Sequence, residues 1–171
     1  MDWVQPTVTS GTPYVVPAGY HRILNWRTKA GSYPNQSLTF KVFRPAGAAF
    51  TYKVIAHDGP RRIHENDNGG PYELNTFKVG IKVRPGDLVG LHTVTDHYKC
   101  DFLASDSDYT RRGNLADGKV GGPFGAGPGY RLNVAAKVGT GKRAAALNKC
   151  KKKQSAEARR KCKKQAKKLP V

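Results

Sequence analysis

The sequence predicts an all-β domain, an antiparallel two-sheet sandwich of jelly-roll type, followed by a short basic α-helical hairpin. Three observations predict it: short runs in which apolar and polar residues alternate, turn residues between those runs, and no long amphipathic helical pattern before residue 139. A closed barrel is the alternative. We expect a β-sandwich domain over residues 1–138 and a Lys/Arg-rich tail over residues 139–171.

The first strands are brief and the third is longer. Residues 7–9 and 14–16 are short β-prone runs, separated by turn residues from a strand predicted at 21–28. Trp26 lies in step with Leu24 in this strand, which favours a core position over a place on a sugar-binding surface.

The fourth run gives the clearest alternation in the chain. Residues 38–43 place Leu38, Phe40 and Val42 on one face and Lys41 on the other. A repeat of two is typical of a strand with one buried and one solvent-facing side. Lys41 is therefore predicted to face water.

The remaining strands repeat this pattern with weaker contrast. Residues 50–56 and 77–83 carry apolar side chains at alternate positions, and residues 88–94, after a Pro-Gly-Asp turn, are the next predicted strand. Residues 100–104 are a weaker candidate, and residues 130–138 form the last predicted strand. The spacing of about eight such strands is typical of a sandwich or barrel.

Two long polar segments interrupt the strands and are predicted to be loops, at residues 57–75 and 105–129. Long loops on a rigid β scaffold often carry binding sites, although ordinary polar inserts have the same composition. Tyr33 and Tyr72 lie in turn-rich segments and are candidate glycan-contacting residues.

Oxygen-bearing side chains gather in these loops and make a weak calcium site conceivable. Glu65, Asp67 and Asn68 precede two glycines in the first loop, and Asp106 and Asp108 lie in the second. Calcium takes six to eight oxygen ligands, but polar turns have the same composition without metal. No cofactor is expected apart from such a structural ion.

No catalytic motif is evident, so we expect a non-enzymatic protein. A hydrolase is the less favoured alternative. His57 is adjacent to Asp58 and Asp96 to His97, but a catalytic triad is defined by its geometry and not by sequence neighbours. Cys100 reads as a small buried thiol rather than a nucleophile or half of a zinc site.

The tail from residue 142 onward favours helix in composition and contains two of the three cysteines. Ser155 is a plausible N-cap, with Glu157 in the first turn. Leu147 shares a helical face with Cys150, and facing this stripe to that of Cys162 builds a hairpin closed by a disulfide. Two unrelated thiols on a disordered arm are the alternative.

The charge of the chain is concentrated in this tail. Residues 139–171 hold 13 Lys or Arg and one acid, whereas residues 1–138 hold 17 and 11, out of a net +18. Such asymmetry indicates a polyanionic partner: an anionic cell-wall polymer, a nucleic acid held nonspecifically, an anionic membrane or a sulfated glycan. A solubilising tail without a dedicated partner is the alternative. The candidate polyanion-binding residues are Lys149, Lys151, Lys152, Lys153, Arg159, Arg160, Lys161, Lys163, Lys164, Lys167 and Lys168.

Several phrases of the sequence are similar to a known module. TVTSGTPYVVPAG, LTFKVFRP, VIAHDGPR, VRPGDLVGL and GYRLNVAAKV resemble a β-sandwich module of secreted actinobacterial proteins, over residues 7–138. The tail, ending in KKLP, resembles the Lys/Cys-rich ends of some of those proteins. The family has no settled activity, so the resemblance implies a fold and a compartment but no functional residue.

The expected location is extracellular or at the cell surface. Cysteines suited to a disulfide favour an oxidising compartment. Residues 1–10 lack the basic start and apolar core of a signal peptide, so this expectation assumes that the export signal is absent from this chain; otherwise the protein is cytoplasmic. No apolar stretch is long enough to span a bilayer.

Overall fold

The structure is a computed structural model and describes residues 1–30, 36–64, 73–94, 101–103 and 109–169. The larger sheet has seven antiparallel strands in the order β10-β8-β1-β6-β3-β4-β9. Their bounds are β1 Asp2–Thr7, β3 Ser37–Pro45, β4 Tyr52–Arg62, β6 Leu88–His92, β8 Tyr109–Gly113, β9 Val120–Gly121 and β10 Gly125–Pro128.

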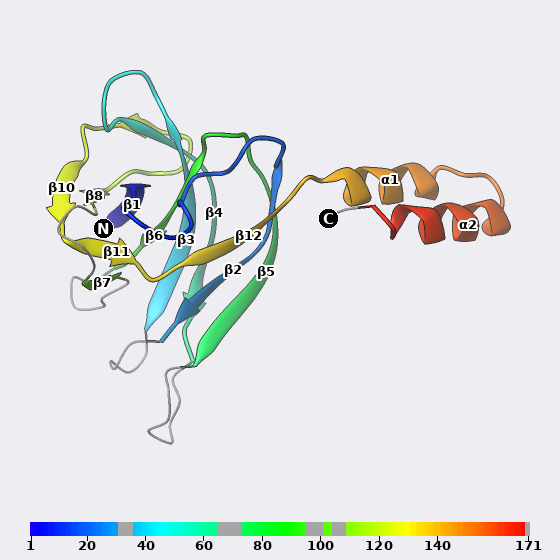
Figure 1. Cartoon of the computed structure of the whole chain (residues 1–171), viewed down its shortest axis with the longest axis horizontal. Coiled ribbons are helices and arrows are strands. Elements are labelled where there is room, and N and C mark those ends of the chain that lie inside the picture. Colours follow the sequence, from blue (N-terminus) through cyan, green and yellow to red (C-terminus); the bar gives the residue numbers. More distant parts are fainter. Residues whose placement is uncertain (31–35, 65–72, 95–100, 104–108, 170–171) are drawn as a thin grey trace.

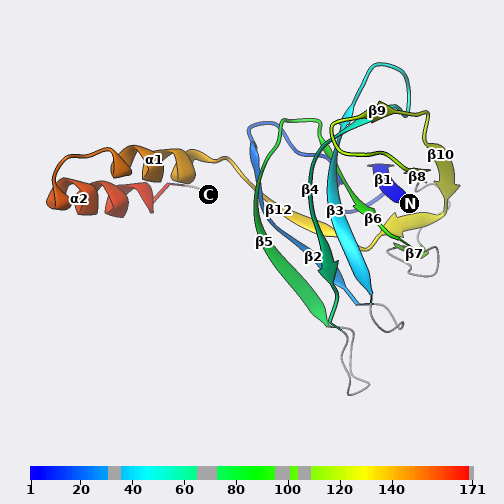
Figure 2. The same ribbon diagram turned by 180° about the vertical axis from the view of Figure 1, so that it is seen from behind.

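A smaller antiparallel sheet has the order β12-β2-β5, and two short strands form a separate pair, β11-β7. Their bounds are β2 Arg22–Lys29, β5 Leu74–Lys82, β12 Ala135–Gly139, β7 Asp101–Leu103 and β11 Tyr130–Leu132. The smaller sheet lies against the inner face of the larger, curled one (Figures 1 and 2). The antiparallel two-sheet prediction is confirmed, and the jelly-roll connectivity stays a prediction.

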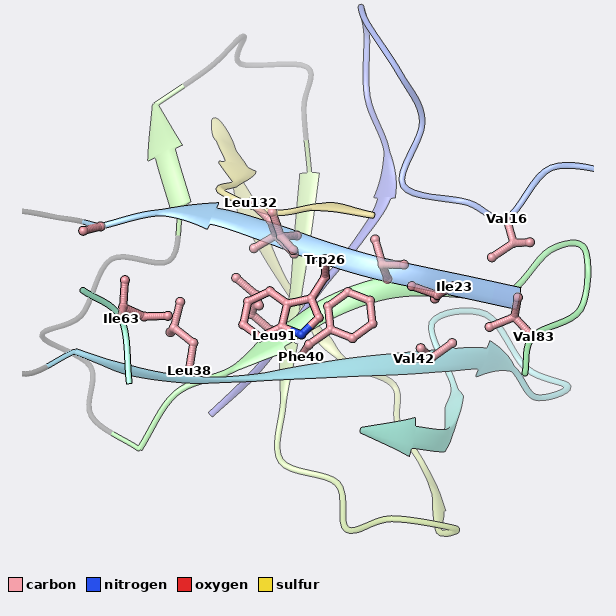
Figure 3. Packing of buried hydrophobic residues seen from close by; sticks show 13 residues of the cluster. Val16, Ile23, Trp26, Leu38, Phe40, Val42, Ile63, Val83, Leu91 and Leu132 are labelled. Atoms are coloured by element: carbon pink, nitrogen blue, oxygen red, sulfur yellow. The ribbon is translucent and has the colours of Figure 1, made fainter. Parts of the chain in front are cut away.

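The main core lies between the two sheets and centres on Trp26, as Figure 3 shows. The indole of Trp26 stacks on Phe40 with ring centroids 5.5 Å apart and contacts Phe77 at 4.5 Å. Its Nε1 donates a hydrogen bond to Asp58 Oδ2 at 2.7 Å, so the one polar atom of the ring is satisfied. The core position predicted for Trp26 is confirmed.

Strand β2 departs from the predicted period of two. Its pairing with β5 shifts between Ile23 and Asn25, which is a β-bulge, so that Ile23 and Trp26 both point into the core. Leu24 is only half-buried. The prediction that Leu24 and Trp26 share the buried face was therefore wrong, because alternation cannot anticipate the extra residue.

A second apolar cluster covers the outer face of the larger sheet. It joins Phe43 and Tyr52 to Leu115 and Phe124, whose segment folds back over the sheet. The rings of Phe43, Tyr52 and Phe124 meet edge to face. This cover also buries Lys41, so the prediction that Lys41 faces water was wrong.

The polar segments are more structured than predicted. Strand β4 runs on to Arg62, into the loop predicted at 57–75, and strands β8, β9 and β10 lie within the loop predicted at 105–129. The first strand, β1, spans Asp2–Thr7 and so lies earlier in the chain than the short strand predicted at residues 7–9. The strand predicted at residues 130–138 is divided near Asn133 into two strands, β11 and β12.

The chain ends in two helices, α1 (Lys142–Lys151) and α2 (Ala156–Ala166), as the composition predicts. They lie side by side and antiparallel, beyond the end of β12 and away from the body of the sheets (Figures 1 and 2). The short link from Gly139 to Lys142 joins them to the sandwich. Gly141 has a φ of 72°, a left-handed conformation that glycine adopts at low cost.

Candidate functional site

Helix α2 begins as its sequence predicts. The Ser155 hydroxyl accepts a hydrogen bond from the backbone N–H of Ala158 at 3.1 Å and caps the helix. Glu157 lies in the first turn, and Lys163 and Lys164 lie in the last, so both ends complement the helix dipole. The N-cap prediction for Ser155 is confirmed.

A disulfide between Cys150 and Cys162 fastens α1 to α2, which confirms the predicted pairing. The two Cα atoms are 5.4 Å apart, and Cys150 and Ala166 are buried between the helices. Beyond the cysteines, the apolar side chains of the hairpin described as buried or half-buried are Ala146, Leu147 and Ala166. At the open end, Arg143 Nε donates a hydrogen bond to the carbonyl oxygen of Leu169 at 2.8 Å.

All eleven basic residues predicted to bind polyanions are exposed on this hairpin. Among the residues that the structure describes, no carboxylate forms an ion pair with a Lys or Arg side chain of the hairpin. Unpaired cations at this density attract anions over roughly a Debye length, about 8–10 Å at physiological salt. The positive charge of the hairpin is thus available to a ligand.

Part of this charge converges on one face of α2. A shallow hollow there is lined by one alanine and five basic side chains: Ala156, Arg159, Arg160, Lys163, Lys164 and Lys167. These positions recur every three to four residues, so they form a row whose members are spaced about 4.5–6 Å along the helix axis. Such a row suits a linear polymer with closely spaced anionic groups. We call it the α2 basic row.

A second basic hollow lies where the sandwich meets the hairpin. Its lining includes Arg22, Lys82, Arg84 and Lys142. Arg22 Nη1 donates to the carbonyl oxygen of Gly80 at 2.7 Å, which orients its guanidinium. Sequence reasoning missed this cluster because its members come from β2, from β5 and the turn after it, and from the start of α1. The signal available was the pair of basic residues at Arg22 and Lys82, which face each other across β2 and β5.

A buried ionic cluster stands on the outer face of the larger sheet. The Asp2 carboxylate contacts Lys41 Nζ at 2.9 Å and His92 Nδ1 at 2.7 Å, and it accepts the backbone N–H of Leu115 at 2.7 Å. Lys41 Nζ also donates to the Leu115 carbonyl oxygen. Burial lowers the pKa of His92, and the positive charges of the Met1 ammonium and Lys41 lower it further. The hydrogen bond and charge of Asp2 raise this pKa, but they do not outweigh the other effects.

Within the described part of the chain, His57 and Asp58 bind other partners instead of forming a dyad with each other. His57 forms an ion pair with Asp117, whereas Asp58 binds Trp26 and Arg61. Burial alone would raise the pKa of Asp58, but the hydrogen bonds from Arg61 and Trp26, with the Arg61 charge, lower it. Both Asp–His contacts of the described structure, His57 with Asp117 and His92 with Asp2, were missed.

Several predicted residues lie outside the described part of the chain. They are the glycan candidates Tyr33 and Tyr72, the calcium candidates Glu65, Asp67, Asn68, Asp106 and Asp108, and also Asp96, His97 and Cys100. Within the described ranges, no three His, Cys, Asp or Glu side chains gather as a metal site would require. No helix in those ranges is long and apolar enough to cross a bilayer.

Comparison with known proteins gives no relative. No family model matches the chain, and neither the curated proteins nor the solved structures contain a significant match.

Proposed function

We propose that the protein is a non-enzymatic extracellular binding or surface-attachment module, and that its helical hairpin binds an anionic polymer such as a cell-wall polymer. The observation that carries this proposal is the α2 basic row, in which Arg159, Lys163 and Lys167 mark successive turns without a carboxylate partner in the described structure. Charge of this density on a small surface favours polyanions over single small anions.

The disulfide supports an extracellular location for this binding. Cytosolic thiols are usually kept reduced, whereas a structural disulfide persists in an oxidising compartment. The sandwich, which we propose to be of jelly-roll type and akin to the secreted actinobacterial modules, then serves as the folded body that carries the hairpin.

A nonspecific nucleic-acid binder is the second candidate, because the α2 basic row suits phosphodiesters of any source. Lys- and Arg-rich surfaces hold DNA through its phosphates without reading sequence. The two candidates differ in compartment, so free thiols at Cys150 and Cys162 in the native host would favour the nucleic-acid role.

The proposal is tested by the salt dependence of binding to a labelled poly(glycerol phosphate) chain, with duplex DNA measured in parallel. The test variant replaces the five basic residues of the α2 basic row by Gln. The control variant removes the same charge from the sandwich, at exposed Lys29, Lys53, Lys78, Lys119 and Lys137. We expect the affinity of the unmodified protein to fall steeply with salt.

In the test variant, affinity should fall at least about ten-fold at low salt, and the salt slope should become shallower. The control variant should lose much less, because its charges are spread over the sandwich. Equal losses in the two variants would show that only total charge matters and would defeat the proposal. Tighter binding to DNA than to poly(glycerol phosphate) would favour the nucleic-acid role.

A further inference from the structure

A hollow distinct from the basic hairpin opens at one edge of the sandwich. It lies between β12, the terminal strand of the smaller sheet, and the segment 12–17, which is attached to the larger sheet. The attachment is by backbone: Val16 N–H donates to Asp87, and Val89 N–H donates to Tyr14. The two walls therefore belong to different sheets, and the hollow leads from the surface toward the core between them.

The floor of this hollow is apolar and already part of the main core. Val16, Val89 and Val134 contribute to it, and each is less than a tenth exposed. The hydroxyl of Tyr14 donates to the Leu132 carbonyl oxygen at 2.6 Å, so Tyr14 presents mainly its ring to the hollow. The volume, about 760 Å³, lies within the range of small-molecule sites.

The rim of the hollow is positively charged. Arg27, on β2, is exposed, and no carboxylate in the described structure forms an ion pair with it. Arg131, on β11, also lines the hollow and is oriented by a contact of 3.4 Å between its Nη2 and Ser10 Oγ. None of the described residues that line the hollow is acidic.

We infer that this hollow binds an amphipathic organic anion, with its apolar body against the valine floor and its carboxylate at the arginine rim. Arginine binds a carboxylate through two parallel hydrogen bonds, which fixes the orientation of the ligand. An apolar body is needed because the described floor residues Val16, Val89 and Val134 offer no polar group to a sugar or a bare phosphate, and the Tyr14 hydroxyl donates to the Leu132 carbonyl oxygen. This inference does not depend on polymer binding by the hairpin.

The inference is tested by calorimetric titration of the full chain with decanoate, decan-1-ol and decylammonium. We expect decanoate to bind at least about ten-fold more tightly than the alcohol, as one charge-assisted interaction at a partly desolvated rim would give. Shortening the chain to octanoate should weaken binding about three- to four-fold for each methylene removed. Decylammonium should bind more weakly than the alcohol.

Variants separate the site from the general positive charge of the protein. Arg27→Gln should weaken decanoate binding about ten-fold and leave decan-1-ol unchanged. Arg27→Glu should reverse the preference toward decylammonium. Ala135→Trp, at an exposed lining position, should block all three ligands. The matched control for Arg27→Gln is Lys137→Gln, which removes a positive charge from β12 outside the hollow. It should leave the binding of all three ligands unchanged.

Three outcomes would overturn the inference: no saturable binding of decanoate, equal binding of decanoate and decan-1-ol, or equal losses in Arg27→Gln and Lys137→Gln. Circular dichroism of each variant shows that it is folded. The Gln variant of the α2 basic row should retain decanoate binding, so failure of the polymer proposal and failure of this one give different results.

Discussion

At the scale of single residues, Lys41 shows what alternation can and cannot predict. The pattern of β3 correctly assigns Leu38, Phe40 and Val42 to the main core. It also assigns Lys41 to the opposite face, but it does not say what covers that face. In the structure, the segment around Leu115 covers it, and Lys41 is buried with Asp2 as its partner.

Replacing Lys41 by Met should therefore destabilise the protein far more than a surface substitution would. Met fills similar space but leaves the buried Asp2 carboxylate without its cation, and breaking a buried pair in this way costs about 3–5 kcal/mol. Urea unfolding followed by Trp fluorescence measures the change. Lys53→Met, at an exposed position on neighbouring β4, should shift stability by less than about 0.5 kcal/mol.

If the two variants were equally stable, Lys41 would not be the counter-ion that Asp2 requires. In that case His92 and the Leu115 N–H would be enough to satisfy the Asp2 carboxylate.

At the scale of elements, local patterns predicted those strands and helices whose own residues specify them. Strands β2, β3, β5 and β6 lie close to their predicted ranges, whereas β4 begins as predicted but runs on to Arg62. Both helices lie in the tail for which the composition and the Ser155 cap, which are local signals, predict helix. Strands β8 to β10 were missed because they are short and rich in Gly and polar residues. Strand pairing with distant partners, not propensity, holds them in place.

The hairpin helices should depend on the disulfide for their order. Cys150 and Cys162 close a loop whose contribution to stability is about 3 kcal/mol, and little apolar contact is available to replace it. Reduction, or the Cys150→Ala/Cys162→Ala pair, should abolish most of the helical far-ultraviolet circular dichroism at neutral pH.

The sandwich serves as an internal control in this experiment. Near-ultraviolet signals from Trp26 should not change on reduction, because Trp26 packs between the two sheets and does not contact the hairpin. Helical signal that survives reduction unchanged would show that the helices fold without the bond.

At the scale of the whole molecule, the charge asymmetry was fully readable from composition, and the eleven candidate residues of the hairpin are exposed as a binding role requires. The basic hollow where the sandwich meets the hairpin and the apolar hollow beside β12 were not predictable. Their lining residues, such as Arg22 with Lys142 and Arg27 with Val16, meet only when strands distant in sequence are paired.

Acid should weaken the whole sandwich through contacts that join its strands. Because the pKa of His92 is lowered in the folded protein, the unfolded chain binds a proton at this histidine at a higher pH than the folded one does. The free energy of unfolding is therefore greatest above about pH 6.5 and declines as the pH falls below that value. Asp58, which bridges the two sheets through Trp26, has a lowered pKa and adds a further loss as the pH falls below about 3.9.

Urea unfolding measured from pH 8 downward tests this expectation. His92→Gln should flatten the first decline, and His21→Gln, at an exposed position, should leave it in place. A decline in the same range that persists in His92→Gln would assign it to another group.

The position of the disulfide also bears on the durability of the hairpin outside a cell. The connection between α1 and α2 is exposed and contains Lys152 and Lys153, so it is a natural target for trypsin-like proteases. A cut there would divide the chain but release nothing, because the bond from Cys150 to Cys162 still holds α2 to α1. A nicked molecule would therefore keep every positive charge of its tail attached to the sandwich.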